Sequence, residues 1–123
     1  MPDPVCAPVL ARARGPAHFK EISTYDMVNL KKFKKLGELA PEAFNSFVAF
    51  DEAALKEGVI PLKYKELMAV AVALTTQCPY CIEVHTNKAK KAGATEQELA
   101  EATLITAALR AGGAVTHGTH TLA

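Results

Sequence analysis

Residues 66–85 read ELMAVAVALTTQCPYCIEVH. The segment from Leu67 to Leu74 is apolar on all sides of a helix, and such a helix is buried either centrally or in a subunit contact. Pro79 disfavours helical geometry at Cys78 and fits the first position of a new helix, so we expect Cys78 to be the N-cap. The stretch therefore predicts two helices on either side of Gln77, packed as an antiparallel hairpin.

The sequence outside this stretch also predicts helices. Strand signals are almost absent, because no apolar alternation is sustained and no Asn-Gly or Asp-Gly hairpin turn occurs. Thr95 and Glu98 have the spacing of a capping box, and Gly112-Gly113 separates the last helix from a short tail. The expected helices cover Ser23 to Leu39, Glu42 to Lys56, Pro61 through Leu74, the cysteines to near Gly93, and Thr95 to about Ala111. We therefore expect an all-α fold, a helical bundle around the hairpin.

Length and charge limit the class of protein. At 123 residues the chain is long enough for one domain, which we place at residues 21–123, after an irregular proline-rich arm at residues 1–20. The formal net charge is only +1, so we expect no nucleic-acid partner. The basic cluster of Lys31, Lys32, Lys34 and Lys35 is interrupted by apolar residues at helical spacing, which is typical of a solvated helix face.

The composition predicts a cytoplasmic protein. The sequence does not open with a basic segment and an apolar run, so no secretory signal is expected. The longest uncharged stretch, Leu67 to Ile82, is too short and too polar at its end to span a bilayer, so we expect no membrane partner. In a reducing compartment, a close cysteine pair is more often catalytic or metal-binding than a structural disulfide.

The Cys78-Pro79-Tyr80-Cys81 motif predicts thiolate chemistry. Both sulfurs are expected at a helix N-terminus, where unpaired amides and the helix dipole favour the thiolate. His85 is four residues beyond Cys81, on the same helical face, and can take the thiol proton. Glu66 is predicted to lie near the level of His85 in the hairpin and to orient its ring. A lone Glu66 or a lone His85 is more often structural, whereas a Cys-x-x-Cys pair in an intracellular chain is usually functional. Together the four residues indicate a catalytic site.

Two other interpretations of the motif remain open. Cys78, Cys81 and His85 could bind zinc or another metal, with a fourth ligand from Glu66, His117 or His120. Cys-Pro-Tyr-Cys is also the glutaredoxin tetrapeptide, but that fold needs strands around the motif. Cys6 is assigned no role, and we expect no cofactor.

The pattern Glu-x11-Cys-x2-Cys-x3-His at Glu66 to His85, followed by Ala92-Gly93-Ala94-Thr95, resembles the alkylhydroperoxidase D-like, carboxymuconolactone decarboxylase superfamily. The resemblance covers about residues 40–112. It implies that Cys81 is the peroxidatic nucleophile and Cys78 the resolving cysteine, with His85 as base and Glu66 activating His85. It also implies a homo-oligomer, a trimer or a hexamer.

Finer features place the chain within that superfamily. It is similar to small single-unit members, in particular the arsenosugar-associated peroxidase-like group, through residues 61–66 and 116–120. Tyr80 departs from the best-known members, which have a histidine there, and lactone decarboxylases generally lack the cysteine pair. We therefore expect a thiol-dependent peroxidase or disulfide oxidoreductase, with a hydroperoxide substrate and a lipoyl-like or thioredoxin-like dithiol reductant.

Overall fold

A computed structural model describes residues 25–123, and within this range every regular element is a helix. This confirms the all-α fold. The predicted arm at residues 1–20, together with Ser23 and Cys6, lies outside the described residues, and the single-domain boundary stays a prediction. The elements are a 3₁₀ helix, η1 (Met27–Lys32), α1 (Phe33–Leu39), α2 (Pro41–Leu55), α3 (Leu62–Thr76), α4 (Pro79–Lys91), α5 (Glu96–Gly118) and η2 (Thr119–Thr121).

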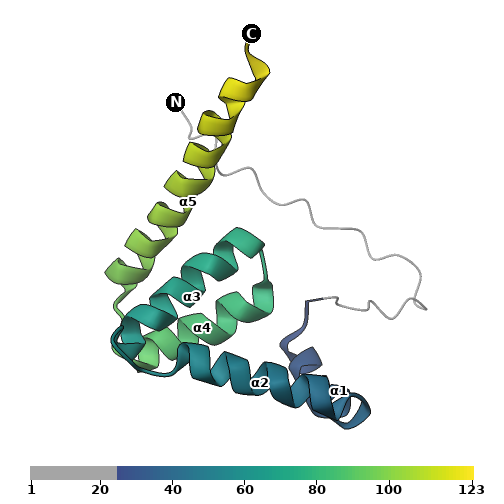
Figure 1. Cartoon of the computed structure of the whole chain (residues 1–123). Coiled ribbons are helices and arrows are strands. Elements are labelled where there is room, and N and C mark those ends of the chain that lie inside the picture. The colour runs from purple at the N-terminus through teal and green to yellow at the C-terminus, as the bar shows by residue number, and fades with distance from the viewer. Residues whose placement is uncertain (1–24) are drawn as a thin grey trace, which may run out of the picture.

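The centre of the fold is the predicted antiparallel hairpin of α3 and α4 (Figure 1). Gln77 ends α3 in the left-handed conformation, with φ 55° and ψ 42°. The Cys78 amide then donates to the Ala73 carbonyl at 3.2 Å, which satisfies one of the last carbonyls of α3. Small side chains let the two helices approach closely, and Ala73 and Ala89 are both buried.

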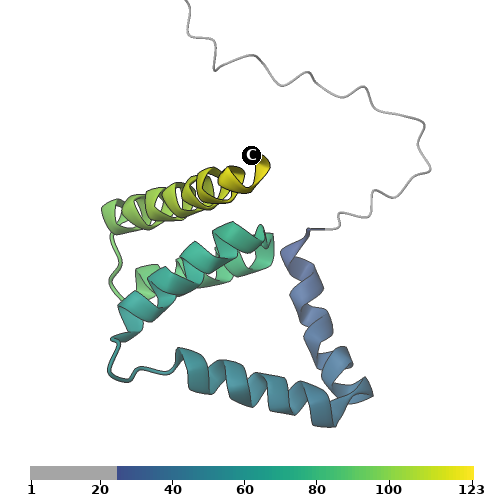
Figure 2. The same cartoon turned by 45° about the horizontal axis from the view of Figure 1, so that its top comes forward.

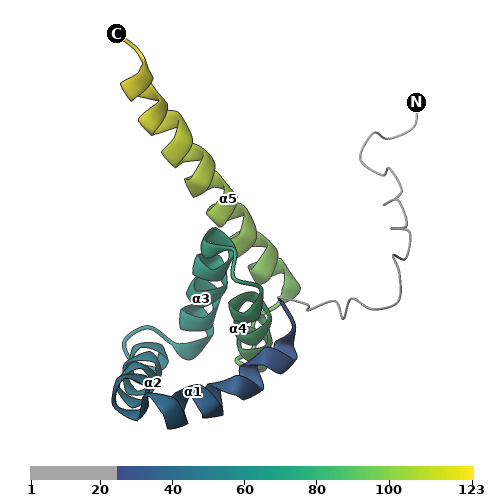
Figure 3. The same cartoon turned by 90° about the vertical axis from the view of Figure 1, so that its right-hand side faces the viewer.

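Helix α5 packs against α3 and continues beyond it. The Thr106 hydroxyl donates to the Ala102 carbonyl at 2.9 Å, and Arg110 donates to the Thr75 carbonyl at 2.8 Å. The predicted end near Ala111 was wrong, because α5 passes through Gly112-Gly113 and ends at Gly118. Glycine costs a helix only about 1 kcal/mol per residue, and the hydrogen bonds of a long helix absorb that cost. Figure 3 shows this last part of α5 projecting past the hairpin.

The η1/α1 segment and α2 form a V beside the hairpin, with η1 near the start of α4 and the end of α2 near the start of α3 (Figure 2). The predicted helix from Ser23 to Leu39 is divided: η1 begins after Asp26, whose carboxylate accepts from the Val28 amide at 2.9 Å, and α1 follows. The lysines of the predicted basic cluster are all exposed, as expected for a solvated face. Helix α2 begins at Pro41, and its C-terminal end returns to α3.

Few apolar side chains of one chain are buried. Among residues 25–123, the buried hydrophobic residues are Val70, Ala73 and Ala89. Met68 and Val72 of α3 remain 52% and 59% exposed. The expectation that the whole segment from Leu67 to Leu74 is buried centrally was therefore wrong for a single chain. The alternative, burial in a subunit contact, stays a prediction. No helix among the described residues combines the length and apolar character needed to cross a membrane.

The capping box of α5 gives a test of the fold. The Glu98 amide donates to the Thr95 hydroxyl at 3.1 Å, and the Thr95 amide donates to the Glu98 carboxylate at 2.9 Å. Thr95→Ala removes the first of these bonds and should lower the free energy of unfolding by about 1 kcal/mol, measured by urea denaturation. Thr103→Ala is the matched control, because the Thr103 hydroxyl only bonds the Leu99 carbonyl within the helix and should be nearly neutral. Equal effects of the two changes would contradict the role of the cap.

Candidate functional site

Cys78 lies at the predicted N-cap of α4. Its backbone is extended, with φ −95° and ψ 102°, and Pro79 is the first helical residue. The Cys78 sulfur accepts the backbone N–H of Cys81 at 3.3 Å, in the way that a serine oxygen caps a helix. Both cysteines are free thiols, and their sulfurs lie 2.7 Å apart. The N-cap geometry at the start of α4 therefore also brings the two sulfurs together.

The two sulfurs share a proton unequally. Because the Cys78 sulfur also accepts the Cys81 amide, it is the better site for negative charge. The hydrogen bond from the Cys81 side chain, followed by that from the Cys81 amide, lowers the pKa of Cys78. The same contact with Cys78, together with burial, raises the pKa of Cys81 to about 11. The lowered pKa that was expected for both cysteines is thus present at Cys78, with the bond from the Cys81 side chain as its largest cause, and not at Cys81 in the reduced pair.

His85 and Glu66 form a hydrogen-bonded pair between α4 and α3. The distance from His85 Nδ1 to Glu66 Oε2 is 2.7 Å, and Glu66 is only 3% exposed. An ionised carboxylate only accepts, so Nδ1 carries the hydrogen and Nε2 of the neutral ring is left as the basic atom. The hairpin therefore brings these two side chains together as the sequence predicted.

Cys81 and His85 line one open groove of about 540 Å³ between α2, α3 and the start of α4. Its walls are mainly apolar. The apolar residues that contribute most exposed surface are Phe50, Ile60, Met68 and Val72. Asp51 of α2 and Lys65 of α3 also line it. The groove gives an apolar molecule access to the Cys81 sulfur beside a base.

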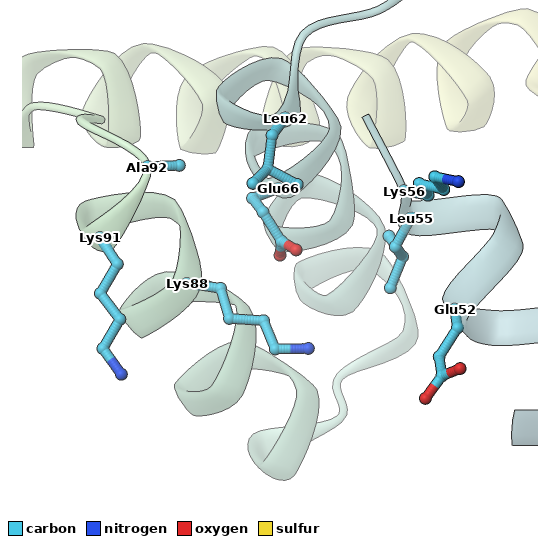
Figure 4. Close-up of a pocket in the computed structure, with 8 residues that line it drawn as sticks. All are labelled: Glu52, Leu55, Lys56, Leu62, Glu66, Lys88, Lys91 and Ala92. Carbon is cyan, nitrogen blue, oxygen red and sulfur yellow. The ribbon is translucent and has the colours of Figure 1, made fainter. Parts of the chain in front are cut away.

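Figure 4 shows the residues that line a second cavity, of about 420 Å³. Leu55 lines both cavities. Glu66 lines the second cavity, and Lys88 and Lys91 come to it from α4. The His85–Glu66 pair therefore extends from the groove that contains Cys81 to a separate, more basic opening.

The remaining candidate residues lie away from this groove or play a different part. The Tyr80 hydroxyl accepts from the Asn29 side chain at 3.0 Å, and the Tyr80 ring packs at 6.2 Å from that of Tyr25. Tyr80 thus fastens the segment before α1 to the start of α4. His117 and His120 stack on each other near the C-terminus, 5.5 Å between ring centres.

Neither alternative interpretation of the cysteine motif gains support. Within residues 25–123, no three histidine, cysteine or acidic side chains gather closely enough to hold a metal ion. The helical surroundings of the motif also differ from the strands that a glutaredoxin fold requires. Sequence reasoning did not find Asp51, because no motif contains it and only the packing of α2 brings it to the groove, and it gave Lys65 no role in the site.

Comparisons with known proteins agree with this fold. Residues 41–122, more than half of the chain, match the Carboxymuconolactone decarboxylase family. Uncharacterized protein 4 in the cox locus of Paracoccus denitrificans is 40% identical over 79 residues, which cover 64% of this chain and 71% of that protein.

Two crystal structures are also similar. A carboxymuconolactone decarboxylase family protein of Legionella pneumophila is 34% identical, with a TM-score of 0.62, over 65% of this chain and 71% of that chain. A protein of Methanobacterium thermoautotrophicum is 37% identical, with a TM-score of 0.66, over 70% of this chain and 97% of that chain. The helical hairpin, the match over residues 41–122 and the similar structures all agree. The chain belongs to the carboxymuconolactone decarboxylase family.

Proposed function

We propose that this protein is a cytoplasmic thiol-dependent peroxidase that reduces a hydroperoxide and forms a Cys78–Cys81 disulfide. The observation that carries the proposal is the position of two free thiols, 2.7 Å apart, beside a histidine whose Nδ1 is held by a buried carboxylate. A cytoplasmic location suits these thiols, because a reducing compartment keeps them available.

The proposed first step takes place at Cys81, which lines the groove together with His85. His85 Nε2 takes the Cys81 proton, and Glu66 stabilises the imidazolium that forms. The Cys81 sulfur attacks the terminal peroxide oxygen, so that an S–O bond forms and the O–O bond breaks. The alkoxide that leaves takes the proton from His85 and departs as an alcohol, with Cys81 oxidised to a sulfenic acid.

Cys78 suits the second step. Its sulfur accepts the Cys81 backbone N–H at the start of α4, and this bond favours the thiolate without requiring the Cys81 thiol. This thiolate attacks the Cys81 sulfur, the S–O bond breaks, and the hydroxide that leaves takes up a proton to become water. A partner dithiol, lipoyl-like or thioredoxin-like, then reduces the disulfide by thiol exchange and is itself oxidised to a disulfide.

The same thiols would also support disulfide exchange without a peroxide. The short distance between the sulfurs favours this second function, because a disulfide needs only a small movement of the side chains. Hydroperoxide consumption separates the two functions.

We further propose that the protein acts as a homo-oligomer. Among residues 25–123, the buried hydrophobic residues are only Val70, Ala73 and Ala89, while many large apolar side chains are exposed. A domain of about 100 residues normally buries a larger core. A contact between copies, which typically buries about 800 Å² on each partner, would cover such side chains.

The exposed apolar side chains indicate where a second copy would pack. A second groove lies between α3 and α5, and its walls include the exposed side chains of Tyr64, Met68 and Ile105. We place the contact on this face, because it leaves the α2 wall of the thiol groove open to substrate. The occupant that we propose is another copy of this chain, because burial of this face supplies the core that a single chain lacks.

The shared proton predicts opposite pKa changes in two variants. Cys81→Ala removes the side chain that most lowers the pKa of Cys78, so that pKa should rise. Cys78→Ala removes the group that most raises the pKa of Cys81, so that pKa should fall from about 11 toward the ordinary range. Thiolate ultraviolet absorbance measured against pH tests both, in a Cys6→Ser background that leaves only these thiols. Shifts in the same direction in both variants would contradict the shared proton.

The peroxidase mechanism predicts an order of losses in kcat/KM. Cys81→Ser should abolish turnover, and His85→Ala should lower it by about 10²- to 10⁴-fold. Glu66→Gln should lower it by only about 10-fold, because an amide oxygen or a water can still hold Nδ1. Hydroperoxide consumption with several dithiol donors gives the values, and Asn87→Ala, exposed on α4, is the control. Cys78→Ser should give one turnover and then stop. Full turnover by Cys81→Ser would refute the mechanism.

The oligomer has its own test. Met68→Glu places a charge at the centre of the exposed apolar face and should convert a trimer or hexamer into smaller species, measured by size-exclusion chromatography with light scattering. Asn87→Glu adds the same charge at an exposed position of α4 and should leave the mass unchanged. A monomeric wild-type protein at micromolar concentration would contradict the proposal.

A further inference from the structure

The thiol groove contains an acidic residue to which the proposed reaction gives no role. Asp51 belongs to the α2 wall of the groove, on the same side of that helix as Phe50 and Ala54. It is exposed, and its carboxylate lies near enough to Cys81 for its negative charge to contribute to the raised pKa of that thiol. A molecule that approaches Cys81 through this groove therefore passes a carboxylate.

Among the described residues, no side chain forms an ion pair with Asp51. Lys65 lines the same groove, but its ammonium donates to the Ala54 carbonyl at 2.9 Å and to the Lys56 carbonyl at 2.5 Å. These carbonyls belong to the C-terminal end of α2, where the helix dipole is negative and a lysine is favourable. Among residues 25–123, the ion pairs formed by side chains are Lys63–Glu98 and His85–Glu66, and neither includes Asp51.

The sulfur pair at the end of the groove offers no positive charge either. The bond from the Cys81 side chain lowers the pKa of Cys78, so any charge that the reduced pair carries is negative. The walls between Asp51 and the sulfurs are mainly apolar. Lys65 keeps its positive charge, but its ammonium is bonded at the end of α2, and Asp51 is the charged wall residue that contributes to the raised pKa of Cys81. An uncharged molecule loses little on entering such a groove, whereas an anion near Cys81 is repelled by Asp51.

We infer that Asp51 is a specificity-determining residue, which makes the groove accept uncharged molecules and reject anionic ones at Cys81. The biological role of this selection rests on the proposed peroxidase function. For that function, the substrate class is an uncharged organic hydroperoxide with an apolar substituent. A dithiolane reductant would enter with its acid group masked, as an amide, rather than as a free carboxylate.

Two alkylating reagents of equal chemistry and different charge test this inference. Iodoacetamide is neutral and iodoacetate is anionic, and with both a thiolate forms the S–C bond while iodide leaves. The ratio of their rates at Cys81 is independent of the thiolate fraction, because both reagents need the same thiolate. The full-length Cys78→Ser protein leaves one thiol in the groove, and mass spectrometry of the peptide that contains Cys81 gives each rate. The same protein in urea gives the intrinsic ratio.

The folded protein should prefer iodoacetamide over iodoacetate more strongly than the chain in urea does. Asp51→Asn should reduce that preference by about 3- to 10-fold, and added salt should also reduce it. Glu52→Gln is the matched control: it removes the same charge from the next residue of α2, which lines the second cavity, and should leave the ratio unchanged.

An unchanged ratio in Asp51→Asn would overturn the inference, and so would an equal reduction in Glu52→Gln. Asp51→Ser removes the charge with a different side chain, so it replaces Asp51→Asn if circular dichroism shows that the latter is unfolded. The assay contains no hydroperoxide, so its result is separate from that of the peroxidase assay. A charge-dependent ratio without turnover would refute the proposed peroxidase and leave the selection at the groove intact.

Discussion

The hydrogen bond between His85 and Glu66 connects the fold to the chemistry. A carboxylate that is 3% exposed is costly without a partner, and the 2.7 Å bond to Nδ1 provides one across the α3/α4 hairpin. The bond favours one register of the two helices, because a slip along the hairpin would leave Glu66 buried and unpaired. It also fixes the tautomer of His85 and turns Nε2 into the basic atom. The stability of the hairpin and the position of the base therefore depend on the same contact.

The turn at the other end of the hairpin fixes the sulfurs in a similar way. Gln77 adopts the left-handed conformation and Cys78 an extended one, so the Cys78 sulfur faces the first amides of α4. The Cys81 N–H that would otherwise lack an acceptor is satisfied by sulfur rather than by oxygen. A thiolate accepts such a bond more strongly than a thiol does. The capping of α4 thus favours charge on Cys78, next to the thiol that lines the groove.

Local rules in the sequence predicted the hairpin, the N-cap at Cys78 and the pairing of Glu66 with His85, because each depends on residues close in sequence or on the rise of one helix. The same rules placed the end of α5 too early, at Gly112-Gly113. The low helix propensity of the two glycines was outweighed by the hydrogen bonds of a long helix, which continues to Gly118. They could not predict that Asp51 lines the groove, because this depends on how α2 returns to α3. They also did not decide whether Met68 and Val72 are covered by their own chain, which is a property of tertiary packing.

Lys65 shows how the fold leaves the Asp51 carboxylate without an ion-pair partner among residues 25–123. Its ammonium has three N–H donors and directs bonds to the Ala54 and Lys56 carbonyls, which α2 leaves unsatisfied where it ends. These bonds hold the α2 wall, including Asp51, against the start of α3. Because the cation is engaged at the helix end, it does not form an ion pair with Asp51. The attachment of α2 and the negative charge beside Cys81 are therefore two results of one arrangement, and the wall that shapes the groove also determines its electrostatic character.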